Sequence, residues 1–368
     1  MISRRAKSID TSGIRRVFNL GAKLENPINL SIGQPDFDAW EPLREAAKAA
    51  IDSQKNGYTV TQGIEPLREK LRQKYGLQAG TGDFEQDVFV TCGVSGALTL
   101  AYMAMCDPGD EVLIPDPFFC IYRDVLSLIN AVPAYYNCYP DFRLRVEEVE
   151  RAITPKTRAI LVNSPSNPTG VSLTQSELDA VIDLARAKDL WLIYDEIYDI
   201  FNYDAPHADA RNKYEKTLII NGFSKSFGVP GWRLGFAVGP NVLLREMMKI
   251  QQYTFVCAPS IAQYAALDGF DIDFAPKVNE YKKKRDFIYS ALSENFEVEK
   301  PTGAFYIFPK APGGNASAFV EKCIQNNLLV IPAGNVFSQQ DTHFRISFAA
   351  PMEKLEQGVE VLNRLVRS

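Results

Sequence analysis

A lysine and an arginine stand eight residues apart in a short segment rich in glycine and aromatic residues. Lys225 follows Ser224, Arg233 comes later, and apolar runs enter and leave the segment at 217–220 and 234–238. A lysine between two apolar strands loses part of its hydration, which favours its neutral, nucleophilic form. An arginine nearby can hold a phosphate through its forked donors. We expect a site for covalently bound pyridoxal phosphate (PLP), with an ordinary solvated lysine as the alternative.

Further segments place polar groups at the ends of predicted strands, where open α/β sheets bind ligands. The segment 91–98 runs from a strand through a glycine turn into a helix, so it could bind a phosphate through free N–H groups or be a plain turn. Asn167 lies in a loop fixed by two prolines. Asp195 ends a strongly apolar strand. A protonated pyridine nitrogen would be a partner for that buried carboxylate, although an Asp that caps the next helix fits equally well.

Two other features have an ordinary structural reading beside the functional one. Phe118 and Phe119 follow a predicted strand, and phenylalanine there is usually part of the core. One of them could instead stack on a flat heteroaromatic ring. Arg345 lies in the middle of a predicted strand, where it could bind a carboxylate with two hydrogen bonds or form an ion pair.

Short apolar runs alternate with helical patterns from residue 88 to residue 239, and this predicts an α/β fold with a mostly parallel sheet. The expected strands are 28–32, 88–92, 111–115, 159–163, 190–194, 217–220, 234–238, 304–308, 328–331 and 344–348. The expected helices are 43–54, 64–75, 97–105, 120–128, 175–188, 242–253, 276–293, 317–326 and 352–365. The expected domains are an N-terminal arm with part of a small domain (1–38), a large domain (39–275) and a smaller α+β domain (276–368).

Composition excludes several classes of partner. The net charge of −5 gives no reason to expect nucleic acid or an anionic membrane. Six scattered cysteines without a Cys-x-x-Cys pair, and only two histidines, argue against a zinc site, a disulfide framework or a metal centre. No apolar run approaches the ~18 residues of a membrane span, and no leader-like apolar region follows the first residues. A cytoplasmic protein is expected.

Taken together and in order, these segments resemble the class I and II aminotransferases of PLP fold type I. The resemblance covers nearly the whole chain. The matching segments are 32–37, 57–59, 93–98, 167–170, 194–198, 224–225, 231–233 and 344–347. It implies a large PLP-binding domain beside a smaller α+β domain, and a ping-pong aminotransferase that moves an amino group between an L-amino acid and a 2-oxo acid.

The resemblance also implies residue roles. Lys225 would attach the cofactor and carry the proton in catalysis, Asp195 would keep the pyridine nitrogen protonated, and Phe119 would stack on the ring. Tyr198 and Asn167 would hydrogen-bond the ring oxygen. The residues implied in phosphate binding are Val94, Ser95, Gly96, Ser224, Arg233 and, from a neighbouring subunit, Tyr58. The residues implied in binding the substrate carboxylate are Gly33, Asn167 and Arg345.

Some expectations stay open at this point. The resemblance implies a homodimer with shared active sites. The same fold and cofactor also support β-elimination, as in cystathionine β-lyase-like enzymes, and a sensor module without turnover is a third reading. Ser95 occupies a position at which some aspartate-specific relatives have lysine, and Phe118, Phe119 and Tyr122 gather near one strand end. We therefore expect neutral or aromatic amino acids to be preferred over aspartate.

Overall fold

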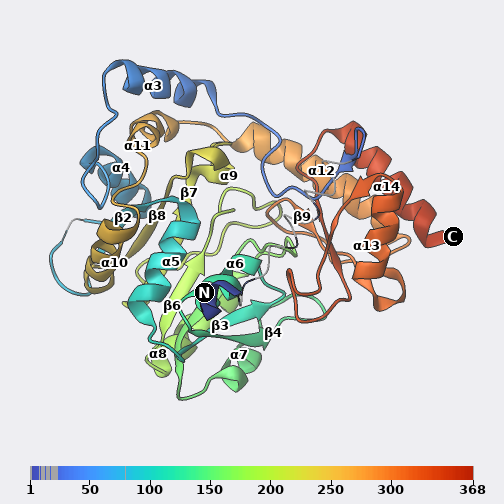
Figure 1. The fold of residues 1–368 in the computed structure, drawn as a ribbon, viewed down its shortest axis with the longest axis horizontal. Helices are drawn as coiled ribbons and strands as arrows, with labels where there is room; N and C mark the ends of the chain where they lie inside the picture. Colours follow the sequence, from blue (N-terminus) through green and yellow to red (C-terminus); the bar gives the residue numbers. More distant parts are fainter. Residues whose placement is uncertain are drawn as a thin grey trace.

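The computed structural model describes residues 2–7, 9, 13, 17, 24–78 and 80–367, so part of the predicted N-terminal arm, mainly within residues 8–23, lies outside the described residues. Figure 1 shows a central sheet with helices on both sides and, next to it, a smaller group of strands and helices formed by the C-terminal part of the chain. Within the described residues, no helix has both the length and the hydropathy needed to cross a bilayer.

Seven strands form the central sheet in the order β2-β8-β7-β6-β5-β3-β4. Their bounds are β2 (Gln86–Thr91), β3 (Glu111–Asp116), β4 (Val132–Asn137), β5 (Thr157–Asn163), β6 (Trp191–Asp195), β7 (Thr217–Gly222) and β8 (Gly235–Pro240). β8 is antiparallel to both of its neighbours, and all other pairs are parallel. The predicted mostly parallel sheet is confirmed. The edge strand β4 was missed, because Pro133 interrupts its apolar pattern and its outer residues are exposed.

Strand β5 shows why helices cover both faces of this sheet. Ile160 and Val162 belong to one hydrophobic cluster, whereas Ala159 and Leu161 belong to another. Successive side chains of a strand point to opposite faces, so a continuous apolar run needs cover on both sides. The first cluster includes side chains from α4 (Glu65–Tyr75), α8 (Gln175–Ala187) and α11 (Ser260–Ala266). The second includes side chains from α5 (Gly93–Met105), α6 (Cys120–Leu128) and α10 (Asn241–Thr254).

The helix boundaries have local causes. Helix α8 begins with the predicted capping box, in which Thr174 accepts a hydrogen bond from the Glu177 N–H and Glu177 accepts one from the Thr174 N–H. Helix α5 begins at Gly93, four residues before the predicted start at 97. The free N–H groups of its first turn therefore belong to the segment that was predicted to bind phosphate.

The C-terminal part of the chain forms most of a further hydrophobic cluster, which Leu30 and residues between 197 and 203 complete. Its antiparallel sheet has the order β11-β12-β9, made by Ile331–Pro332, Phe344–Ser347 and Tyr306–Ile307. Its helices are α12 (Ala275–Ser293), α13 (Ala316–Gln325) and α14 (Met352–Arg367). Strand β1 (Ile28–Asn29) pairs in parallel with β10 (Leu328–Leu329), so the start of the chain joins this group. The division into domains at residues 38 and 275 stays a prediction.

Several predicted elements differ in length from the observed ones. The strands expected at 28–32 and 304–308 shrink to β1 and β9, and the run 328–331 divides into β10 and β11. Ala304 has a φ of 52°, which is incompatible with extended backbone and delays the start of β9. The remaining elements are α1 (Arg4–Lys7), α3 (Glu41–Asp52), α7 (Val146–Ala152), α9 (Phe223–Ser226) and the 3-10 turns Pro230–Trp232, Leu267–Gly269 and Pro312–Gly314.

Candidate active site

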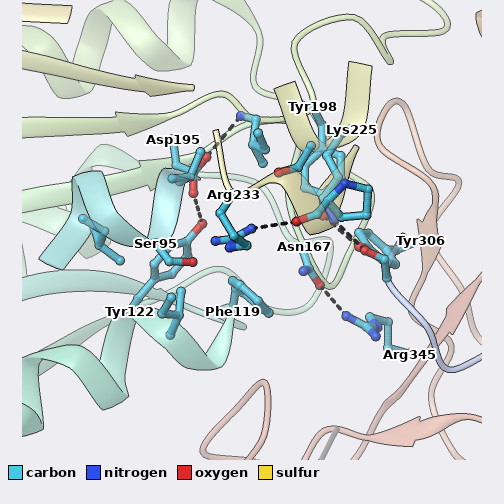
Figure 2. Close-up of a pocket in the computed structure, with 17 residues that line it drawn as sticks. Ser95, Phe119, Tyr122, Asn167, Asp195, Tyr198, Lys225, Arg233, Tyr306 and Arg345 are labelled. Carbon is cyan, nitrogen blue, oxygen red and sulfur yellow. Dashed lines mark hydrogen bonds between the residues drawn. The ribbon is translucent and has the colours of Figure 1, made fainter. Parts of the chain in front are cut away.

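A pocket of about 260 Å³ lies where several central strands end, facing the C-terminal sheet. Figure 2 shows residues from β6, α5, α6, α9 and β12 converging on it. The predicted site residues that line it are Gly33, Val94, Ser95, Phe119, Asn167, Asp195, Tyr198, Ser224, Lys225, Arg233 and Arg345. Two predicted residues do not line it. Gly96 is buried in the first turn of α5, and Tyr58 lies on the surface with 87% of its side chain exposed.

Lys225 lies in the single helical turn that follows β7, and its side chain reaches into the pocket. Its ammonium group donates a hydrogen bond of 2.6 Å to the backbone carbonyl of Gly33. Burial, and after it the positive charges of Arg345 and Arg233, lowers the pKa of Lys225 from 10.5 to about 8. A substantial fraction of this amine is therefore neutral near physiological pH, which agrees with the expectation from its apolar flanks.

Asp195 ends β6 and is buried at the base of the pocket. Burial raises the pKa of this carboxyl to about 6, and the hydrogen bonds that it accepts act in the opposite direction. The Tyr122 hydroxyl donates to Oδ2 at 2.7 Å, and the Ile197 N–H donates to Oδ1 at 3.1 Å. Two fixed donors favour the charged form and hold the carboxylate in one orientation.

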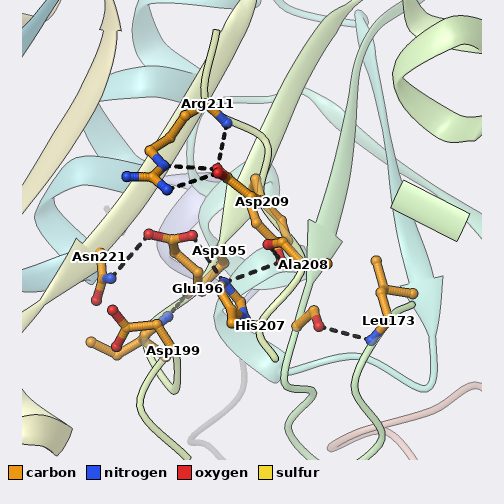
Figure 3. Close-up of polar contacts among 12 residues, drawn as sticks. Leu173, Asp195, Glu196, Asp199, His207, Ala208, Asp209, Arg211 and Asn221 are labelled. Carbon is orange, nitrogen blue, oxygen red and sulfur yellow. Dashed lines mark hydrogen bonds and ion pairs between the residues drawn. The ribbon is translucent and has the colours of Figure 1, made fainter. Parts of the chain in front are cut away.

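The next residue, Glu196, belongs to a separate polar cluster, which Figure 3 shows around His207 and Asn221. Its carboxylate accepts hydrogen bonds from the Tyr75 hydroxyl at 2.5 Å, from Asn221 at 3.2 Å and from His207 at 3.0 Å. These partners come from α4, from β7 and from the loop after β6. The backbone that presents Asp195 is therefore fixed by contacts of its neighbour that do not involve the pocket.

The first turn of α5 and Arg233 together form a cradle for an anion. A Cβ atom added to Gly93 would lie 2.6 Å from Nη2 of Arg233, so the absence of a side chain at Gly93 leaves room for the guanidinium at this helix start. Gly93 also has a φ of 74°. Val94 and Ser95 of α5, and Ser224 just before Lys225, also line the pocket. Free N–H groups, the helix dipole and a guanidinium suit a phosphate group.

Arg345 is almost completely buried in β12, between the rings of Tyr306 and Phe337. Its Nη1 donates to Oδ1 of Asn167 at 3.0 Å, and its Nη2 donates to the carbonyl of Ser31 at 2.7 Å. Its Nε has no hydrogen-bond partner among the described residues. A buried guanidinium without a carboxylate partner is costly, and a bound carboxylate would provide the missing acceptor.

Two tyrosines of the site were missed as site residues by the sequence analysis. Tyr306 lies in β9 and shares a hydrogen bond of 2.7 Å with the hydroxyl of Tyr198. Nothing in its local sequence indicated this contact. Tyr122 contacts Asp195 and lies three residues after Phe119, at a spacing that places both on one side of α6. That spacing could have identified it. Phe119 lines the pocket and Phe118 is buried, which separates the two aromatic residues.

These groups fit PLP. Lys225, whose pKa is lowered, can react as a neutral amine with the PLP aldehyde, and the buried carboxylate of Asp195 can face the ring nitrogen. The anion cradle formed by Arg233 and the first turn of α5 can hold the phosphate. The unpartnered Arg345 Nε fits the carboxylate of an amino acid. The chemistry of the pocket thus matches both a cofactor and an α-carboxylate substrate.

Comparison with known proteins gives the family. Residues 25–362 match the family model "Aminotransferase class I and II". A probable aspartate aminotransferase of Methanocaldococcus jannaschii is 38% identical over 99% of this chain and 100% of its own length. Aromatic-amino-acid aminotransferase 2 of Thermococcus litoralis is 34% identical over 100% of this chain and 98% of its own length.

Solved structures agree with this match. The aspartate aminotransferase of Thermus thermophilus with maleate has a TM-score of 0.93 at 31% identity and covers 99% of both chains. The aspartate aminotransferase of Thermotoga maritima has a TM-score of 0.92 at 31% identity and covers 100% of both chains. The chain therefore belongs to the class I and II aminotransferases, and it is a PLP-dependent enzyme of that family.

Proposed function

We propose that this enzyme transfers amino groups from neutral or aromatic L-amino acids to 2-oxo acids, in two half-reactions on a single pocket. The observation that carries this proposal is the convergence of Lys225, Asp195 and the unpartnered Arg345 Nε on that pocket. Together they provide a nucleophilic amine, an acid–base partner for a ring nitrogen and a receptor for an α-carboxylate.

Each role is supported by a contact. Bound PLP supplies an electron-accepting ring that stabilises negative charge at the substrate Cα. The Lys225 amine holds the cofactor between turnovers and, once released from it, carries a proton to and from the substrate Cα. Asp195, held by Tyr122, keeps the ring nitrogen protonated. Val94, Ser95, Ser224 and Arg233 would hold the phosphate at the start of α5, with Gly96 behind them in its first turn, and Phe119 would stack on the ring.

The ring oxygen and the substrate carboxylate share a hydrogen-bonded network. Asn167 uses Oδ1 to accept from Arg345, which leaves its NH₂ group for the ring oxygen. Tyr306 can donate to Tyr198, and the Tyr198 proton is then available for the same oxygen. Arg345 binds the carboxylate, with the Gly33 backbone beside it. The same contacts would therefore orient the ring and the substrate relative to each other.

The preference for neutral donors is supported by the charges of the lining. The cations among the described lining residues are Lys225, Arg233 and Arg345, and each already has a proposed partner. Ser95 is short and uncharged, and Leu98, Phe119, Ile121, Ile197 and Pro230 are apolar. Within the described residues no lining cation remains for the second carboxylate of aspartate. The names of the relatives do not decide the donor, since they include aspartate and aromatic-amino-acid aminotransferases.

A single-turnover screen tests the proposal. Holoenzyme is mixed with one amino acid at a time, and the loss of the cofactor absorption band is followed without an acceptor. We expect phenylalanine, tyrosine or leucine to react with a higher specificity constant than aspartate. A higher constant for aspartate than for every neutral donor would overturn the preference. Release of pyruvate and thiol from cystathionine without an oxo acid would indicate β-elimination instead.

A homodimer with shared active sites and a cytoplasmic location belong to the same proposal. Tyr58, Val60 and Tyr253 are apolar or aromatic side chains with more than half of their surface exposed. The loop that carries Tyr58 and Val60 lies against α10, which carries Tyr253, because Gln251 of α10 donates to the carbonyl of Thr61 at 2.7 Å. Large exposed apolar and aromatic side chains on adjoining segments support a protein interface. All six cysteines are free thiols, which suits a reducing compartment.

A further inference from the structure

A second cavity, of about 410 Å³, shares a wall with the active-site pocket. The shared wall is α9: Ser224 and Lys225 line the active site, whereas Phe223, Ser226 and Phe227 line the second cavity. Lys70, Gln73 and Lys74 of α4 form another wall, and residues 269–274, which lead into α12, complete it. Its size is within the range of pockets that hold small organic ligands.

The interior of this cavity is aromatic. Five phenylalanines line it: Phe223, Phe227, Phe236, Phe270 and Phe274. The rings of Phe223 and Phe227 lie 4.9 Å apart between centroids, and those of Phe227 and Phe274 are stacked at 6.0 Å. Phe270 is only partly buried, so part of its apolar surface is available. A flat apolar ring can pack against such faces with a favourable geometry.

The rim carries one cation and one anion that have no ion-pair partner among the described residues. Lys70 lies with its ammonium group 5.4 Å from the centre of the Phe270 ring. Asp271 is exposed beside that ring. Lys74, by contrast, is already paired with Asp199 at 3.0 Å. The two unpaired charges at the rim, one positive and one negative, therefore cancel. They lie next to the apolar interior of the cavity without forming an ion pair with each other.

We propose that this cavity binds an α-amino acid with an aromatic side chain, with its ring among the phenylalanines, its carboxylate at Lys70 and its ammonium group at Asp271. A zwitterion matches the two unpaired rim charges, whereas a simple anion would meet Asp271 and a simple cation would meet Lys70. This site is separate from Arg345, which binds substrate in the proposed function. Because α9 carries Lys225, an occupant of the cavity contacts the segment that positions the reactive amine.

Binding is measured on holoenzyme fixed with borohydride, which cannot turn over. The probe is 4-fluoro-L-phenylalanine, observed by fluorine NMR. We expect two bound environments, one per pocket. Lys70→Glu should remove one of them or weaken it at least tenfold and leave the other. The matched control Lys322→Glu reverses the charge of an exposed lysine on α13 and should leave both. One or two environments that Lys70→Glu and Phe270→Ala both leave unchanged would overturn the proposal.

A second probe tests the zwitterion. 3-(4-Fluorophenyl)propionate lacks the amino group, so it should bind the second cavity at least tenfold more weakly, and Asp271→Asn should abolish this difference. Equal affinities for the two probes in the unmodified protein would contradict an amino-acid ligand. Crystals soaked with 4-bromo-L-phenylalanine should show anomalous bromine density between α4 and α9. Bromine in the active-site pocket alone would exclude the second site. Thermal melting checks that each variant is folded.

Discussion

The hydroxyl of Tyr122 donates a hydrogen bond of 2.7 Å to Oδ2 of Asp195 at the buried base of the active site. Burial alone would push this carboxyl towards its neutral form, and its pKa is raised to about 6. A donor aimed at the charged form opposes that shift. In the proposed function Tyr122 is therefore a positioning residue that would act on the ring nitrogen through Asp195.

Tyr122→Phe keeps the ring and removes the donor. Hydrogen bonds to charged groups contribute roughly 1.5–3 kcal/mol, so kcat should fall about tenfold or more. The pKa of Asp195 should rise, and the lower pH limit of activity should therefore move upwards by about one unit. The pH profile of the half-reaction measures this shift. A loss of activity with an unchanged profile would mean that Tyr122 only fills space, and Asp195→Asn provides the reference for complete loss of the charge.

The lowered pKa of Lys225 leads us to expect that the rate of cofactor attachment depends on pH. Only the neutral amine attacks the aldehyde, and the lowered pKa of about 8 sets its population. The rate of PLP attachment to the apoprotein should rise about tenfold per pH unit below pH 8 and level off above it. An unperturbed lysine would continue to gain rate to beyond pH 10. Absorbance stopped-flow measures the rate, and mass spectrometry after borohydride should find the adduct on Lys225.

The same shift affects the stability of the apoprotein. Between pH 8 and the ordinary pKa of 10.5, the unfolded chain holds a proton on Lys225 that the folded chain has lost. Stability should therefore rise with pH across this window relative to Lys225→Met, and the protonated lysine should be destabilising below pH 8. Denaturant midpoints at pH 7, 9 and 10.5 test the sign. A difference between the two proteins that does not change with pH would contradict the lowered pKa.

Arg345→Lys should affect substrates that carry a carboxylate more strongly than amines that lack one. The guanidinium fork is oriented by Asn167 and Ser31, and a lysine offers a point charge without that geometry. Loss of one charge-assisted bond costs roughly 1.5–3 kcal/mol, so KM should rise about tenfold to a hundredfold for all amino and oxo acids. Amines without a carboxylate should lose much less. An equal loss in both classes would make Arg345 a structural residue.

The sequence predicts elements where one pattern decides them. Helix α6 was predicted from Cys120 to Leu128 and has those bounds, because its apolar face is regular and its neighbours are strands. Strand β4 was missed because an edge strand lacks a continuous apolar run. Helix α5 begins earlier than predicted, because the glycine and serine residues in its first turn are more typical of a loop than of a helix.

The predictions for the active site divide in the same way, into residues that a local pattern indicates and contacts that it does not. Asp195 and Lys225 were predicted as site residues because a charged side chain next to an apolar strand is unusual, and both line the pocket. The Tyr198–Tyr306 contact joins residues 108 positions apart, and it depends on how the C-terminal sheet packs on the strand ends. The different partners of Asp195 and Glu196 were also not predictable, since Tyr122, Tyr75 and His207 come from distant elements. Tertiary packing decides these contacts, and local sequence does not encode it.

The exposed position of Tyr58 leads to a prediction about how two subunits share their active sites. Its side chain is 87% exposed in a glycine-containing loop and lies outside the pocket of its own chain. If a partner subunit's phosphate site receives it, Tyr58→Phe should weaken PLP retention about tenfold, because a hydrogen bond to a charged phosphate is lost. Dialysis against phosphate buffer, followed by the absorbance of retained cofactor, measures this loss. Equal retention in both proteins would leave Tyr58 as an ordinary surface residue.

Subunit mixing decides whether the sites are shared. Tyr58→Ala and Lys225→Ala should each be inactive or nearly so as homodimers. After dissociation and reassociation, a hybrid dimer with shared sites carries both lesions in one site and none in the other, so activity should return to about half of the unmodified level per hybrid. Native mass spectrometry counts the hybrids, and mixing Lys225→Ala with Asp195→Asn is the control, because both residues serve the site of their own subunit and every site of that hybrid therefore keeps one lesion. Confirmed hybrids without recovered activity would contradict shared active sites.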